Sequence, residues 1–164
     1  MKKLLLLIFI PFISIGQVDS FKDIQGINSL DQFKRVMIEN NYEFDSIDKD
    51  GDILYGFNIA KDSIKGNKST SWAWHSKTGN RWSVSFTRSN LLSEWLGAEA
   101  DNSENSYDLI VKDIKEKCKF YKIITTKISK DDFSCYSCAS STYKGKIGFM
   151  IREKTGFIKH FPEE

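Results

Sequence analysis

Three cysteines and two histidines are the residues of this chain whose types and spacing most readily suggest chemistry. Cys135 and Cys138 have the Cys-x-x-Cys spacing of thiol–disulfide oxidoreductases, in which a thiol is activated at a helix N-terminus. Here both residues fall in a predicted strand, where residues three apart point to opposite sides and their Cα atoms are about 10 Å apart. That separation is too long for a disulfide, and the setting does not favour redox activity.

The first 16 residues have the pattern of a signal peptide, described below, and an exported chain favours a structural disulfide. We expect Cys118 to pair with Cys138, or alternatively with Cys135, and so to tie the second helix to its sheet. A bridge of this kind closes a loop of roughly 20 residues and contributes about 3 kcal/mol of stability. The third cysteine is then buried and free, or pairs between chains.

The histidines, His75 and His160, each lie near the end of a predicted strand. Neither has a serine, cysteine or carboxylate partner in a recognisable catalytic order, and no Gly-x-Ser-x-Gly sequence occurs. The spacing of the cysteines, histidines and acids does not match a metal site, and no cofactor motif is present. The sequence therefore predicts no catalytic residues, no metal and no cofactor, and a small hydrolase is the least favoured function.

Four tryptophans lie close together in sequence, at positions 72, 74, 82 and 95. If Trp72, Trp74 and Trp82 share one face, they form an aromatic surface for a sugar, peptide or protein, because tryptophan offers a large contact area at little entropy cost. Tryptophan on an alternating strand is more often buried, so a place in the core is the competing interpretation. The candidate binding residues are Trp72, Trp74, Trp82, His75 and Arg81.

A β-hairpin is predicted to carry these tryptophans. Large and small side chains alternate over 71–75 and again over 82–86, which is the period of a strand with one buried face. Residues 77–80 supply the turn, where Gly79 and Asn80 tolerate a positive φ.

The rest of the chain predicts helices and strands in two similar series. Ser29 is a helix N-cap with Gln32 three residues later, and Asn40 ends that helix; Asn105 or Ser106 caps a second helix that ends near Cys118. A short helical turn is expected at 91–96. The other predicted strands cover 42–47, 53–59, 120–128, 133–139, 146–152 and 157–161.

Residues 77 positions apart match in the two series. Lys77-Thr78-Gly79 recurs as Lys154-Thr155-Gly156, and Trp72 and Trp74 correspond to Phe149 and Ile151. A constant spacing over some 50 residues indicates a tandem repeat. We expect a first repeat at 17–98, a linker at 99–105 and a second repeat at 106–164, together one compact α+β domain. It would have about two helices and eight strands, with the helices on one face of a curved antiparallel sheet.

This order of elements, over the whole mature chain, resembles the tandem-repeat architecture of the β-lactamase inhibitor protein family. The resemblance lies in element order and length, so it assigns no role to any residue. It implies a curved sheet with helices on its convex side and an aromatic-lined concave face, which in that family binds another protein.

The first 16 residues have the pattern of a cleaved signal peptide. Two lysines precede an apolar run of about 12 residues, and Ser14 and Gly16 precede a cleavage site before Gln17. The run is shorter than the ~20 residues of a membrane span and contains Pro11. Without Lys2 and Lys3, the 24 basic residues fall to 22, which equals the 22 acidic residues. A neutral, exported protein is therefore expected, in the periplasm or outside the cell, with no nucleic-acid partner and no stable membrane insertion.

The favoured function is a non-enzymatic binding or inhibitor-like module that uses the aromatic hairpin to bind a protein or carbohydrate. The alternative is a structural or assembly protein of the envelope, in which a free cysteine links subunits.

Overall fold

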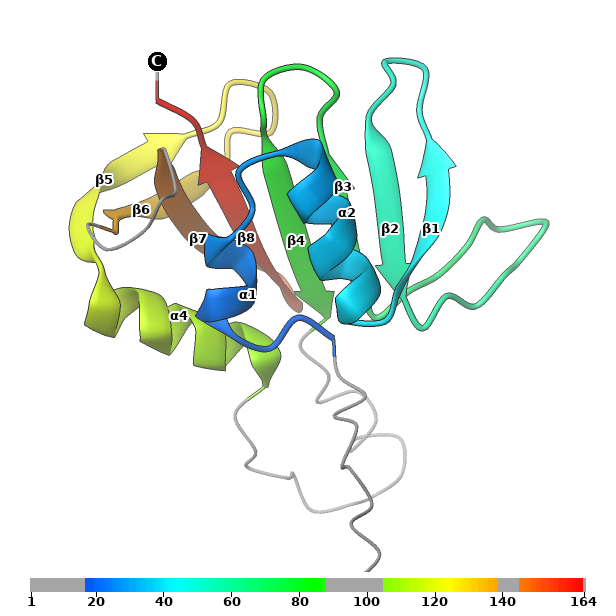
Figure 1. The fold of residues 1–164 in the computed structure, drawn as a ribbon, viewed down its shortest axis with the longest axis horizontal. Helices are drawn as coiled ribbons and strands as arrows, with labels where there is room; N and C mark the ends of the chain where they lie inside the picture. Colours follow the sequence, from blue (N-terminus) through cyan, green and yellow to red (C-terminus); the bar gives the residue numbers. More distant parts are fainter. Residues whose placement is uncertain (1–16, 88–104, 139–144, 164) are drawn as a thin grey trace, which may run out of the picture.

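The computed structural model describes residues 17–87, 105–138 and 145–163 (Figure 1). Its helices are α1 (Phe21–Gln25), α2 (Leu30–Glu39) and α4 (Ser106–Lys117). Its strands are β1 (Tyr42–Ile47), β2 (Ile53–Phe57), β3 (Ser71–His75), β4 (Trp82–Thr87), β5 (Lys119–Thr125), β6 (Asp132–Ser137), β7 (Lys146–Arg152) and β8 (Thr155–Phe161). The predicted α+β class is confirmed, with one more helix than expected. The predicted signal peptide, the short helix at 91–96 and residues 99–104 of the linker lie outside the described residues.

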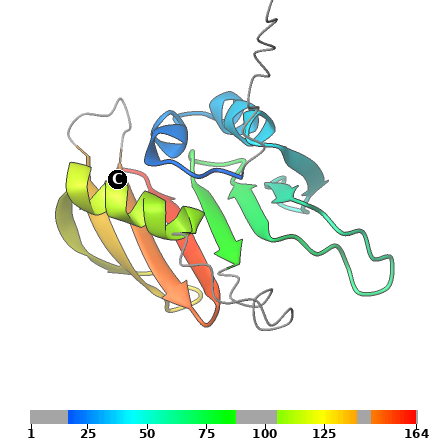
Figure 2. The ribbon, with the colours of Figure 1, turned by 90° about the horizontal axis from the view of Figure 1, so that it is seen from below.

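All eight strands form one open antiparallel sheet, in the order β1-β2-β3-β4-β8-β7-β6-β5. The helices α1, α2 and α4 pack on one side of this sheet, as the two views in Figures 1 and 2 show. We call that side the helix-covered face and the other side the open face. No helix in the described part of the chain is long and apolar enough to cross a membrane.

Each helix begins at a polar side chain that accepts a hydrogen bond from the first turn, which satisfies a backbone donor that has no partner within the helix. Ser29 caps α2 through the amide of Gln32, and Asn105 caps α4 through the amide of Asp108. The short helix α1 has a complete capping box between Ser20 and Asp23. The caps therefore fix where the chain turns onto the helix-covered face.

The core lies between the three helices and the sheet. Phe33 and Met37 of α2, and Ile110 and Ile114 of α4, are fully buried. They meet buried side chains of the strands, namely Tyr55, Ala73, Trp82, Val84, Phe86, Ile147 and Ile158. One continuous apolar layer thus joins the two series of elements.

Apart from α1, the two halves of the chain have the same order of elements: α2 precedes β1 to β4, and α4 precedes β5 to β8. The halves meet where β4 pairs with β8. The N-caps Ser29 and Asn105 are 76 positions apart. Both edge strands contain a bulge, at Asp45 and at Tyr121, which are also 76 positions apart. At the centre of the sheet Ser83 pairs with Lys159, again 76 positions away. An approximate two-fold axis therefore passes through this central pair.

The spacing of 77 residues expected from the sequence is wrong by one position at these points. An odd error matters in a strand, because successive side chains point to opposite faces. Trp72 lies on the open face, whereas its expected counterpart Phe149 lies on the helix-covered face, beside Ile158. The two Lys-Thr-Gly sequences also differ in structure. Gly79 lies in the turn after β3, whereas the turn after β7 consists of Glu153 and Lys154, and Gly156 is already within β8.

Candidate functional site

The predicted tryptophans do not lie on one surface. Trp72 and Trp74 of β3 point to the open face and are partly exposed. Trp82 of β4 is fully buried on the helix-covered face, where its indole nitrogen donates to the Ile27 carbonyl over 3.3 Å. The expectation that Trp82 shares a surface with the other two is therefore wrong. The reason is the register, since Trp74 pairs with Ser83 and Trp82 with His75.

His75 is also removed from the candidate binding surface. It is 3 % exposed, and its ring lies 5.0 Å from the ring of Phe33 in α2. Its Nε2 is 3.2 Å from the side-chain oxygen of Asn80. Arg81, by contrast, is exposed at the start of β4. Only Trp72, Trp74 and Arg81 of the predicted set remain at the surface.

The open face brings together residues from five neighbouring strands. In one cross-strand row, Leu54, Trp74, Ser83, Lys159 and Gly148 lie side by side. The neighbouring cross-strand row consists of Gly56, Trp72, Ser85, Phe157 and Met150. Each row therefore has a small serine of β4 between a tryptophan on one side and a large side chain of β8 on the other. We call Trp72, Trp74, Ser83, Ser85, Phe157 and Lys159 the central patch.

Trp72 is held in place by its neighbours. A side chain at Gly56 would collide with the Trp72 ring and with Ile59, so the glycine leaves room for both. The indole therefore packs over the β2 backbone, which limits its rotamers and lowers the entropy cost of binding.

Lys159 within the central patch and Arg152 beside it lie over aromatic rings. Burial lowers the pKa of Lys159, and the nearby charge of Arg81 lowers it further. The Lys159 ammonium lies 5.9 Å from the Phe133 ring and 5.8 Å from the Phe161 ring. Arg152 lies 5.2 Å from the Phe157 ring and forms an ion pair with Asp131 at 3.1 Å. Cations and aromatic rings are therefore direct neighbours at the β7–β8 side of the central patch.

The histidines do not form an exposed catalytic centre. His160 is 1 % exposed, and its Nδ1 donates to the Asn80 backbone carbonyl over 2.6 Å. Asn80 therefore contacts both histidines, His75 through its side chain and His160 through its backbone, and the His160 ring lies 5.8 Å from the Trp82 ring. Among the described residues, no three histidine, cysteine or acidic side chains are grouped in a way that could hold a metal ion.

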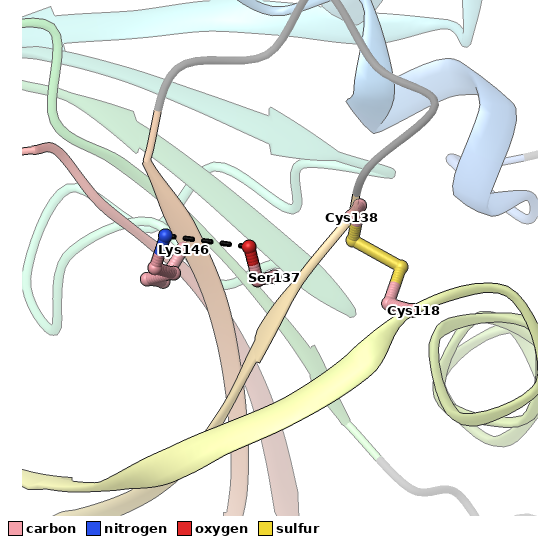
Figure 3. Close-up of a disulfide and its surroundings, with 4 residues drawn as sticks. All are labelled: Cys118, Ser137, Cys138 and Lys146. Atoms are coloured by element: carbon pink, nitrogen blue, oxygen red, sulfur yellow. Dashed lines mark hydrogen bonds between the residues drawn. A yellow bond between two sulfur atoms is a disulfide. The ribbon is translucent and has the colours of Figure 1, made fainter.

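The disulfide joins Cys118 and Cys138, as predicted, and the alternative with Cys135 is not formed (Figure 3). It connects the residue that ends α4 to the residue that follows β6, so it closes the open end of the β5–β6 hairpin. Cys135 is free and fully buried against Gly148, and burial raises the pKa of its thiol to about 11. The third cysteine is thus buried and free, the first of the two outcomes expected for it, and burial of this thiol disfavours a cysteine link between subunits.

Comparison of the chain with protein-family models, with curated proteins and with solved structures finds no match. The sequence does not predict four residues of the central patch, because the residues that lie side by side on adjacent strands depend on the strand register. These four are Ser83, Ser85, Phe157 and Lys159. The alternation of Phe157, Lys159 and Phe161 in the sequence was the one signal that could have indicated them.

Proposed function

We propose that this protein is a non-enzymatic binding module of an exported chain, and that its central patch binds the surface of another protein. The observation that carries the proposal is the pair Trp72 and Trp74, side by side on the open face and partly exposed. Contiguous apolar surface that is rimmed by polar residues marks interaction sites on folded proteins, because burying it against a partner removes it from water.

The composition of the patch favours a protein partner. Tryptophan and arginine are the residues most enriched at the energetic centres of protein interfaces, and Trp72, Trp74, Arg81 and Arg152 lie on or beside the patch. Ser83 and Ser85 add short hydrogen-bonding groups between the large rings. The element order, which resembles that of the β-lactamase inhibitor protein family, also supports use of the open face. The disulfide is consistent with export to the periplasm or beyond.

The test uses the mature, oxidised chain as bait against the envelope and secreted proteins of its source. The informative variant is Trp72→Ala with Trp74→Ala. The matched control is Trp82→Phe, which also removes an indole but from the buried face. We expect one defined partner that binds the wild type and the control and binds the double variant at least tenfold more weakly, the usual loss when an interface loses a central tryptophan.

Equal binding of the partner by the double variant would exclude the central patch as the interface. Binding to a polysaccharide array, with loss in the double variant, would assign the same patch to a carbohydrate ligand instead.

A further inference from the structure

Within residues 17–87, 105–138 and 145–163, the sheet is open and has two edges that no further strand pairs with, β1 and β5. An edge strand presents a row of backbone groups that can pair with another strand. β5 is seven residues long, and nearly all of its side chains are exposed, including Phe120, Tyr121 and Ile123. β5 also carries Lys119, Lys122 and a bulge at Tyr121, which are features that keep edge strands from pairing with a like edge, so an edge of opposite charge is the partner that suits it.

The two edges carry opposite charges. β1 has Glu43 and Asp45, and β5 has Lys119 and Lys122. None of these four side chains forms an ion pair within the described residues. The Asp45 carboxylate accepts hydrogen bonds from Asn67 and Ser46, which leave its charge uncompensated.

The apolar side chains of the two edges also match. Phe44 and Ile47 of β1 are 54 % and 59 % exposed, and Phe120 and Ile123 of β5 are 56 % and 61 % exposed. The two residues of each pair are three positions apart, which in a regular strand would place them on opposite faces. Both point to the helix-covered face here, because the bulge of each strand lies between them. The edges therefore present the same spacing of large side chains.

Strand direction allows the two edges to meet. The sheet has eight strands that alternate in direction throughout, so β1 and β5 run in opposite directions. A second copy placed beside the first in the same orientation therefore brings its β1 antiparallel to β5. The helices of both copies then lie on the same side, and the helix-covered faces are continuous.

We propose that β5 of one molecule pairs with β1 of a second copy, in a register that places Phe120 beside Ile47 and Ile123 beside Phe44. The same register places Lys122 beside Asp45 and diagonal to Glu43. Opposite charges and large apolar side chains thus occupy neighbouring positions across the interface, which are the pairs that stabilise antiparallel strands.

β5 is ordered in advance for this pairing. The disulfide fixes the chain immediately before it, at Cys118. At its other end, the Thr126 amide donates to the Asp131 carbonyl over 2.9 Å, and the Thr126 hydroxyl lies 2.7 Å from that of Ser129. A strand held at both ends loses little conformational entropy on association.

The contact is heterologous, because each copy uses a different edge toward each neighbour. Such a contact continues from copy to copy, so the product is a row of molecules with one continuous sheet. The open face stays free in every copy, and this association is therefore independent of the binding function proposed for the central patch.

The test uses two charge-reversed variants of the mature, oxidised chain. Lys119→Glu with Lys122→Glu makes both edges acidic, and Glu43→Lys with Asp45→Lys makes both edges basic. The control, Lys22→Glu with Lys154→Glu, changes the net charge by the same amount at exposed positions in α1 and in the turn between β7 and β8, away from both edges. Sedimentation velocity is measured from about 10 µM to about 1 mM, the range in which weak interfaces associate.

We expect the wild type and the control to associate with rising concentration. Each edge variant alone should associate at least about tenfold more weakly, because like charges then face each other. An equimolar mixture of the two variants should regain association, because acidic edges then meet basic edges. The proposal is overturned by a wild type that stays monomeric at 1 mM, by edge variants that associate as the wild type does, or by a mixture that stays monomeric.

Discussion

Removal of the disulfide should weaken the second half of the sheet by a predictable amount. Cys118 and Cys138 are 20 positions apart, and cross-linking a loop of that length removes about 3 kcal/mol of conformational entropy from the unfolded chain. The variant Cys118→Ser with Cys138→Ser should therefore lose about 3 kcal/mol of unfolding free energy. With a urea dependence of about 2 kcal/mol per molar, the midpoint falls by about 1.5 M, and the melting temperature falls by about 6 to 12 °C.

The assay is urea unfolding of the mature chain, followed by the fluorescence of the buried Trp82 and by circular dichroism. Cys135→Ala is the control, because it removes the free cysteine and leaves the bridge intact. A midpoint in the double serine variant within about 0.2 M of the wild type would refute the loop-entropy reasoning, since that difference corresponds to about 0.4 kcal/mol. Loss of the bridge in Cys135→Ala would instead show that Cys135 is a bridging residue.

Two further predictions concern buried side chains. Trp82→Ala should cost about 3 to 5 kcal/mol in urea unfolding, because it empties a fully buried site and removes a hydrogen bond, whereas Trp72→Ala at the partly exposed position should cost less than half as much; equal costs would contradict the assignment of faces. The Cys135 thiol, with its pKa raised to about 11, should resist a thiol reagent at pH 8 in the folded protein and titrate as one thiol per chain in urea. This pKa is higher in the folded state than the usual value near 9, so the free energy of unfolding includes a contribution from the protonated thiol. That contribution is complete below pH 9 and should be lost as the pH rises toward 11. Rapid labelling of the folded protein at pH 8 would show instead that Cys135 is accessible.

The sequence predicted most elements correctly because their signals are local. The polar caps Ser29 and Asn105 mark the starts of α2 and α4, and alternation marks the strands. The short helix α1 was missed, because five residues are too few to show a helical period. Its capping box, Ser20 with Asp23, was the available signal.

The face of each tryptophan could not be predicted from alternation alone. The hairpin turn is closed by a hydrogen bond from the Ser76 amide to the Arg81 carbonyl, with four residues between them. With this turn length, even-numbered residues of β3 lie opposite odd-numbered residues of β4. Trp74 therefore lies beside Ser83 rather than in line with Trp82. A turn longer or shorter by one residue would have placed all three tryptophans on one face.

The buried face of β3 also has an unexpected composition, with Ser71, Ala73 and His75. Small or polar residues of this kind usually face solvent, but Ser71 and His75 have contacts within the core. The Ser71 hydroxyl donates to the Ser85 carbonyl over 2.6 Å and lies 2.6 Å from the Tyr42 hydroxyl, and His75 packs on Phe33. Polar residues can face a core when hydrogen bonds compensate the loss of water, and these partners come from distant positions in the sequence.

The junction between β4 and β8 has a consequence for how the chain folds. Every other strand pair joins strands within the same half, so most pairings form between positions close in sequence. Pairing of Ser83 with Lys159 closes a much longer loop, and long-range closure is entropically slow. We expect each half to collapse early and the two to dock last. A chain cut between residues 88 and 104 would then keep every strand pair except β4–β8 within one fragment, so the two pieces should reassemble when mixed.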